Sequence, residues 1–223
     1  MIKEIWLFDW RRRGIKTGFQ QVNSGLELDY MWYSPTETST CFQILRFTKD
    51  WIRSYFEYSS KKIDFVFVDF GAGAGKTNLI AAELGFPISI AFEIDPELVQ
   101  LAKQNFANAR YSKNSRTMMK TFTGDVTNRN HVEKLKKLIE SHIPEGRQFI
   151  LIAYNKNSYG PNALEKSIFA LDKEFGRYVY LYQNPVHKQV LERLGMNIHR
   201  HIQDPHLRKN RDWLIATRDQ TSI

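Results

Sequence analysis

Short apolar runs alternate with amphipathic segments from about residue 61 to the end of the chain. The apolar runs are rich in β-branched and aromatic residues and predict buried strands, while apolar residues at helical spacing between them predict helices. The strands are expected at 64–70, 87–94, 119–125, 147–155 and 177–184, and the helices at 77–85, 96–109, 128–143, 163–175 and 185–195. This alternation predicts an α/β fold with a doubly wound, mostly parallel sheet.

Two more apolar runs, at 196–203 and 212–218, bring the expected sheet to seven strands. No long helical segment separates these two runs. Because antiparallel neighbours can be joined by a short connection, we expect them to form an antiparallel hairpin at one edge of the sheet.

Residues 1–60 follow a different pattern. Residues 6–21 are aromatic and contain Gly14 and Gly18, which is typical of irregular or turn-rich structure. Residues 41–56 have helical spacing of apolar residues and predict one amphipathic helix. We therefore divide the chain into a helical and irregular N-terminal extension, 1–60, which could act as a lid, and a main domain, 61–223.

The segment from Val68 to Thr77 is the most informative part of the sequence. It places a glycine-rich turn between the first expected strand of the main domain and the following helix. Such turns bind nucleotide-like ligands, because glycine permits a tight turn and the helix N-terminus offers N–H groups. A turn without any ligand is disfavoured, since several glycines weaken a chain unless something must approach closely.

Two nucleotide-binding patterns fit this turn incompletely. A phosphate-binding P-loop ends as Gly75-Lys76-Thr77 does, but it also requires a glycine where this chain has Phe70. The dinucleotide pattern G-x-G-x-x-G, counted from Gly71, requires a third glycine at the position of Lys76. Both patterns therefore remain weaker alternatives.

A third pattern, Asp-x-Gly-x-Gly-x-Gly, is met in full by Asp69, Gly71, Gly73 and Gly75. On these residues the chain resembles the class I, Rossmann-like methyltransferases that depend on S-adenosylmethionine. The resemblance implies that the glycine loop lies under the methionine part of this cofactor. It also implies that Asp69 contacts the cofactor's amino group, directly or through water.

Two later acids match the same family. Glu93 ends the second expected strand, and an acid about twenty residues beyond a glycine turn can accept hydrogen bonds from a ribose. The resemblance implies that Glu93 binds both ribose hydroxyls, that Asp125 faces the adenine amine and that Val126 lies beside the ring. Asp95, followed by proline, is expected to cap the next helix instead.

The resemblance covers at least Phe65 to Asn184, and within the family it is closest to a poorly characterised bacterial group. A looser likeness to non-SET lysine methyltransferases favours a protein amine, such as lysine, as the methyl acceptor, ahead of nucleic acid or a small molecule. One alternative is a non-catalytic subunit that keeps the fold and binds nucleic acid or protein. Another is a nucleotide-dependent enzyme that uses the Gly-Lys-Thr end of the loop.

The acceptor side carries less information. Methyl transfer depends mainly on holding the acceptor in line with the methyl group, so few catalytic side chains are required. Where amine methyltransferases carry an Asn-Pro-Pro-aromatic motif after the fourth strand, only Asn155 is present, because Lys156 and Asn157 replace the next positions. Asn155 and Tyr154 are therefore the candidates for lining the acceptor pocket, although Asn155 fits a turn cap equally well.

Other reactive side chains predict no further site. Cys41 lies on the expected N-terminal helix and is interpreted as a buried small residue. His199 and His201 could share one strand face, as metal ligands do, but no third ligand is evident, so we expect solvated histidines on an edge strand and no bound metal.

Composition sets the remaining limits. The formal net charge is +8, with basic clusters at 11–13 and 103–120 that could contact nucleic acid or an acidic protein. One cysteine excludes an intramolecular disulfide. No apolar run is long enough to span a bilayer, and the first ten residues do not resemble a signal peptide, so we expect a cytoplasmic protein.

Overall fold

A computed structural model describes residues 14–17, 20–21, 32–33, 38–56, 63–109, 117–155, 160–183, 188–202 and 213–219. The strands are β1 (Gln20–Gln21), β2 (Trp32–Tyr33), β3 (Ile63–Phe70), β4 (Ile88–Glu93), β5 (Met118–Thr123), β6 (Gln148–Asn155), β7 (Arg177–Gln183), β8 (Asn197–Ile202) and β9 (Trp213–Asp219). The helices are α2 (Thr38–Phe56), α3 (Lys76–Glu83), α4 (Pro96–Ala109), α5 (Arg129–Glu140), α6 (Pro161–Glu174) and α7 (Lys188–Arg193).

Seven strands form one sheet in the order β5-β4-β3-β6-β7-β9-β8, which confirms the expected α/β fold. The pairs from β5 to β7 are parallel, whereas β9 is antiparallel to both β7 and β8. The last two strands thus form the predicted antiparallel hairpin at the edge of the sheet, with β9 between β7 and β8. A separate two-stranded ladder pairs β1 with β2.

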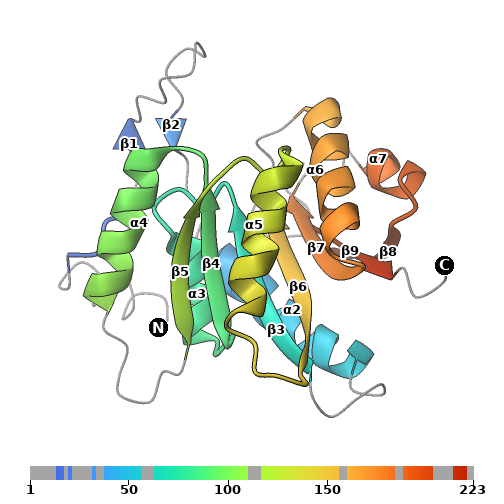
Figure 1. Ribbon diagram of the computed structural model, residues 1–223, viewed down its shortest axis with the longest axis horizontal. Coiled ribbons are helices and arrows are strands. Elements are labelled where there is room, and N and C mark those ends of the chain that lie inside the picture. Colours follow the sequence, from blue (N-terminus) through green and yellow to red (C-terminus); the bar gives the residue numbers. More distant parts are fainter. Residues whose placement is uncertain are drawn as a thin grey trace.

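Helices cover both faces of the sheet, as the doubly wound pattern requires (Figure 1). On one face α5 and α6 pack over β3, β4, β6 and β7, and α7 packs against β8. On the other face α2, α3 and α4 pack over the central strands. The predicted N-terminal extension therefore contains a helix, α2, that packs into the core of the main sheet. Much of the rest of this extension, the possible lid, lies outside the described residues.

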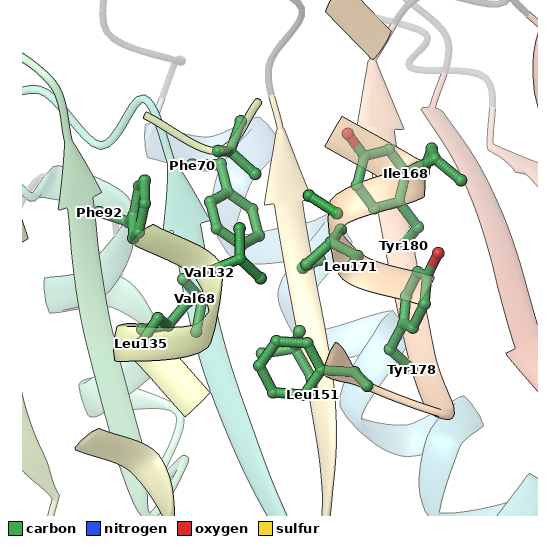
Figure 2. Close-up of a cluster of buried hydrophobic side chains, with 14 of the residues drawn as sticks. Val68, Phe70, Phe92, Val132, Leu135, Leu151, Ile168, Leu171, Tyr178 and Tyr180 are labelled. Carbon is green, nitrogen blue, oxygen red and sulfur yellow. The ribbon is translucent and has the colours of Figure 1, made fainter. Parts of the chain in front are cut away.

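Alternation along β3 explains how a central strand serves both faces. Val66, Val68 and Phe70 point toward α5 and α6, whereas Phe67 points toward α2 and α3. Figure 2 shows the first face, where the α5 and α6 side chains meet those of β3, β4, β6 and β7. Because the central strands are buried on both faces, their sequences are continuous apolar runs, which is why they were predictable.

The edge strand β8 differs from expectation in one detail. The ladder with β9 shifts register between Ile198 and Arg200, at the position of His199. This ring contacts Trp51 and Tyr55 of α2 and shares a hydrogen bond of 2.7 Å with the Thr217 hydroxyl. His199 is therefore half-buried against aromatic rings and not solvated. Within the described residues, no three His, Cys, Asp or Glu side chains gather as a metal site.

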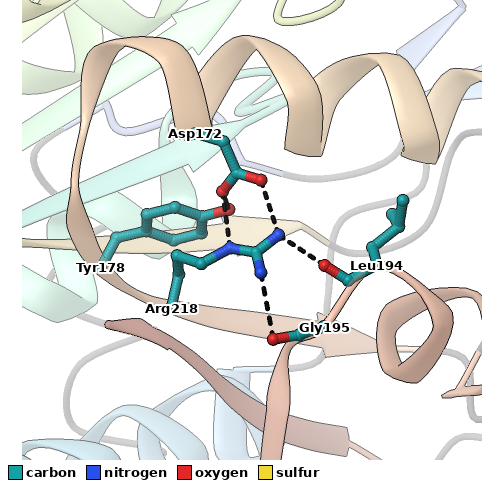
Figure 3. Close-up of polar contacts among 5 residues, drawn as sticks. All are labelled: Asp172, Tyr178, Leu194, Gly195 and Arg218. Carbon is teal, nitrogen blue, oxygen red and sulfur yellow. Dashed lines mark hydrogen bonds and ion pairs between the residues drawn. The ribbon is translucent and has the colours of Figure 1, made fainter. Parts of the chain in front are cut away.

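A clasp at the amino edge of the sheet ties its last elements together. The Arg218 guanidinium on β9 donates to both carboxylate oxygens of Asp172 on α6, at 2.8 and 2.6 Å. It also donates to the carbonyls of Leu194 and Gly195, and the Tyr178 hydroxyl donates to Asp172 (Figure 3). The clasp joins α6, β7, β9 and the turn before β8.

Among the helices of the described segments, none has the length and apolarity needed to cross a membrane.

We predict that Arg218→Ala lowers the free energy of unfolding by about 3 kcal/mol, because it leaves the largely buried Asp172 carboxylate without its counter-ion and removes the donor to two carbonyls. Arg147→Ala is the matched control, since Arg147 also makes a two-point pair with an aspartate, Asp64, but is 37% exposed against 13% for Arg218. The control should lose less than about 1 kcal/mol. Urea unfolding measures both, and equal losses would contradict this account of the clasp.

Candidate functional site

The carboxyl ends of four parallel strands meet at one edge of the sheet. In register, Phe70 of β3 lies beside Phe92 of β4 and Asn155 of β6, and Glu93 lies beside Thr123 of β5. Strand β3 sits where the order reverses, between β4 and β6. Ligands of parallel α/β sheets bind at this switch point, outside the carboxyl ends.

The glycine loop uses a backbone that only glycine adopts without strain. Gly71, Gly73 and Gly75 have φ angles of 80°, 54° and 74°. At Gly75 a side chain would also collide with α4, because a Cβ atom would lie 2.6 Å from the Phe106 ring and 3.2 Å from Ala102. Turn geometry thus favours glycine at all three positions, and close packing adds to this at Gly75.

The first N–H groups of the loop are turned toward β4. Gly71 and Ala72 donate to the Phe92 carbonyl at 2.9 and 3.2 Å, and Gly73 donates to Glu93 Oε2 at 2.8 Å. A P-loop instead directs its N–H groups at a phosphate chain. Together with the Glu93 carboxylate at the loop, this arrangement disfavours a polyphosphate ligand.

Glu93 is the centre of this arrangement. Its side chain is 7% exposed, and its other oxygen, Oε1, accepts from the N–H groups of Ile94 and Asp95 at 2.8 and 3.0 Å. Burial raises the pKa of Glu93, and the charge of Asp95 adds to the rise, while the three backbone hydrogen bonds oppose it. With three acceptor positions used, Oε2 keeps one position for a ligand donor.

Asp95 caps α4, as expected from the sequence. Its Oδ1 accepts from the N–H groups of Glu97 and Leu98 at 2.8 and 3.2 Å, whereas Oδ2 is buried without a partner. Between the two acids, Ile94 exposes 47% of its surface. The sequence pattern predicted Ile94 as part of the buried strand, but β4 ends at Glu93 and Ile94 lies exposed beyond it.

Asp125 and Val126 lie beyond the end of β5. Asp125 accepts from the Thr127 hydroxyl and N–H, and its own N–H donates to His131 Nδ1. Val126 is 2% exposed and belongs to the core beneath α5. Asp125 is therefore half-buried at the same edge as Glu93, while the Val126 side chain is largely covered.

Asn155 and Tyr154 end β6 on opposite faces of the sheet. The Asn155 amide is buried and donates to the Tyr180 hydroxyl at 3.4 Å, on the side of α5 and α6. Tyr154 faces α2, where its ring packs 4.8 Å from Trp213 and 5.9 Å from Phe67. Of the two, only Asn155 is hydrogen-bonded to the buried Tyr180 hydroxyl. Burial raises the pKa of that hydroxyl to about 12.

Cys41 is fully buried, as the sequence predicted. Burial raises the pKa of its thiol to about 12, and hydrogen bonding to Thr77 offsets only part of this rise. The thiol is therefore protonated and not a nucleophile near neutral pH. Residues 11–13, 110–116, 156–159 and 184–187 lie outside the described residues. Of the bases in the stretch 103–120, Lys103 and Lys120 are described, and both are exposed.

Comparisons with known proteins support the fold. No family model and no curated protein matches the chain. A candidate RNA methyltransferase from Pyrococcus horikoshii is 18% identical, with 93% of this chain and 95% of that chain covered and a TM-score of 0.51. The magnesium protoporphyrin IX methyltransferase of Synechocystis PCC 6803, with bound SAM, is 16% identical over 95% and 91%, with a TM-score of 0.49. The fold is that of class I methyltransferases.

We predict that Gly75→Ala destabilises the protein more than Gly146→Ala. Both glycines have positive φ, 74° and 73°, so each alanine is strained by about 1–2 kcal/mol. Only at position 75 does the added methyl group also collide with Phe106, which adds about 1–3 kcal/mol, whereas nothing lies within 4 Å at Gly146. Thermal unfolding of the two variants tests this, and equal shifts would show that α4 yields to the methyl group.

Proposed function

We propose that this chain is a methyltransferase that uses S-adenosylmethionine. Asp69, Gly71, Gly73, Gly75, Glu93, Asp125 and Val126 would form the cofactor site. The observation that carries the proposal is the Glu93 carboxylate bonded to a glycine loop whose first N–H groups are already bonded to the sheet, with Asp69 and Asp125 near the ends of the two neighbouring strands.

The charge of this edge suits a cationic nucleoside. S-adenosylmethionine presents a sulfonium, an amino group, two ribose hydroxyls and an adenine amine, which are positive charges or hydrogen-bond donors. Asp69, Glu93 and Asp125 offer acceptors in a row along β3, β4 and β5, in a protein whose net charge is +8. Carboxylates at a ligand site repel phosphate and attract these groups.

Individual residues divide the work of binding. Glu93 would accept a ribose hydroxyl at the free position of Oε2, and Asp69 at the end of β3 would hold the amino group. The exposed Ile94 side chain, next to Glu93, supplies an apolar surface on which an adenine ring can rest. Asp125, which already accepts from Thr127, keeps acceptor capacity for the adenine amine.

The chemistry asks little more of the protein. The bound cofactor supplies an activated methyl group, and the chain would contribute by holding the acceptor in line and excluding water. We propose a protein amine, such as a lysine side chain, as the acceptor. Asn155, at the end of β6 and hydrogen-bonded to Tyr180 on the neighbouring strand, would line the acceptor side. Tyr154, on the other side of the sheet, would support the edge by packing.

Calorimetric titration with S-adenosylhomocysteine tests the cofactor site. We expect saturable binding by the wild-type protein, and at least tenfold weaker binding by Asp69→Ala and Glu93→Ala, since a charged hydrogen bond is worth about 1.5–3 kcal/mol. Asp64→Ala is the matched control, because Asp64 lies at the opposite end of β3. No binding by folded wild-type protein would contradict the proposal and favour the non-catalytic subunit.

The pH dependence of the same titration tests Glu93. Its raised pKa means that the carboxylate gains its proton at a higher pH than an ordinary glutamate, whose value is 4.5. Binding that needs the carboxylate therefore weakens as the pH falls through this raised pKa, which is at a higher pH than for an ordinary glutamate. Glu93→Gln should bind weakly, without this pH dependence. Identical pH profiles would exclude Glu93 as the titrating group.

Transfer of a labelled methyl group tests the reaction and the acceptor. Incubation with labelled S-adenosylmethionine and a cell extract should label a protein, and acid hydrolysis should release methyl-lysine. Asn155→Ala should lower the rate at least tenfold while leaving S-adenosylhomocysteine affinity within about twofold, because Asn155 would act on the acceptor. Label in nucleic acid or in a small molecule would overturn the protein amine, and absence of any labelled product would favour the binding subunit.

A further inference from the structure

One buried amide joins the N-terminal segment to the glycine loop. Asn105, in the middle of α4, is 1% exposed. Its Nδ2 donates to the Lys16 carbonyl at 2.8 Å and to the Ala74 carbonyl at 2.9 Å, and its Oδ1 accepts from the Lys16 N–H at 2.8 Å. Both amide protons and the carbonyl oxygen are therefore engaged with backbone groups that lie 89 and 31 residues away.

The position of Asn105 would ordinarily be apolar. The other buried residues of α4 are all apolar, at Leu98, Val99, Ala102 and Ala109. Burying an amide is unfavourable unless its hydrogen bonds are made, so its value lies in the groups that it joins. Its partners are a loop on one side and an N-terminal segment on the other.

The N-terminal segment at this point is docked and not simply adjacent. Ile15 is 6% exposed and belongs to the core formed with α2 and α3, and Thr17 is also buried. Asn105 pairs with both the N–H and the carbonyl of Lys16, as a neighbouring strand would. Residues 14–17 thus lie against α4. Two hydrogen bonds between the Asn105 side chain and the Lys16 backbone, and the buried Ile15 side chain, hold them there.

The same turn of α4 fixes the glycine loop. Ala74, which receives the second Asn105 proton, stands between Gly73 and Gly75. The Phe106 ring, next to Asn105 in sequence, packs where a Cβ of Gly75 would be. One helical turn therefore sets the distance between residues 14–17 and the loop.

We propose that Asn105 is a positioning residue that holds residues 14–17 against the glycine loop, so that this segment forms one wall of the ligand site. The proposal rests on the function proposed above. It assigns to Asn105 the coupling of two parts of the chain: a ligand that contacts both the loop and the segment binds the docked state preferentially. By linkage, loss of docking lowers the affinity for the ligand, and the bound ligand stabilises the docked state of residues 14–17.

Hydrogen exchange and ligand binding, measured on the same variants, test the proposal. In Asn105→Ala we expect the amides of residues 14–17 to exchange at least tenfold faster, and S-adenosylhomocysteine to bind about tenfold more weakly. Asn105→Asp, which keeps the shape and the acceptor but loses both donors, should act in the same direction. In the wild-type protein, S-adenosylhomocysteine should slow exchange at residues 14–17.

Leu135→Ala serves as the control for general destabilisation. Leu135 is buried on α5, on the opposite face of the sheet, and its truncation should lower the free energy of unfolding by about 2–5 kcal/mol. It should leave both exchange at residues 14–17 and ligand affinity within about twofold of wild type. A similar loss of affinity in Leu135→Ala would show that the effect of Asn105 is one of stability alone.

Two other outcomes would overturn the proposal and can be told apart. If the wild type and both Asn105 variants bind S-adenosylhomocysteine equally, the segment is not a wall of the site, while the proposed function stands. If the folded wild type does not bind S-adenosylhomocysteine at all, the proposed function fails, and the wall fails with it.

Discussion

The parallel pairing of β3 with β4 on one side and β6 on the other is the interaction on which the site depends. These ladders fix Phe70 beside Phe92 and Asn155, and so bring three separate loops to one edge. The glycine loop then closes onto β4 through the Phe92 carbonyl and the Glu93 carboxylate. A shift of one residue in either ladder would turn the loop and its acids to different faces.

Buried polar groups are treated differently at the amino and carboxyl ends of the parallel strands. At the amino edge, Arg218 satisfies Asp172 and two carbonyls, so charge is buried in a fully paired group. At the carboxyl edge, Glu93 is buried with a raised pKa and Asp95 keeps a buried oxygen without a partner. Unmet polar capacity at one edge, supported by a saturated network at the other, is the arrangement expected of a binding site on a stable scaffold.

Helix α4 connects the site to the rest of the chain. Its first turn is capped by Asp95, next to Glu93, and its third turn carries Asn105 and Phe106 against the glycine loop. The helix thus contacts both the glycine loop and the turn that follows β4. It also gives residues 14–17, which are distant in sequence, a fixed place beside that loop.

The fold could be predicted from the sequence because residue types and their spacing within each short segment determine its strands, helices and turns. Apolar runs buried on both faces marked β3, β4, β6 and β7, and Gly71, Gly73 and Gly75 marked a turn with positive φ that other residues resist. The Asp95 cap and the buried Cys41 were likewise set by neighbours in sequence and by residue type.

Only the tertiary structure decided which polar groups meet. It inserted β9 between β7 and β8, placed Asn155 and Tyr154 on opposite faces, covered Val126 and exposed Ile94. Above all, it joined Asn105 to Lys16 and Ala74, a contact that no spacing along the chain could reveal. Sequence periodicity records which face of an element is buried, whereas hydrogen bonds between distant elements depend on how the packed elements are set against one another.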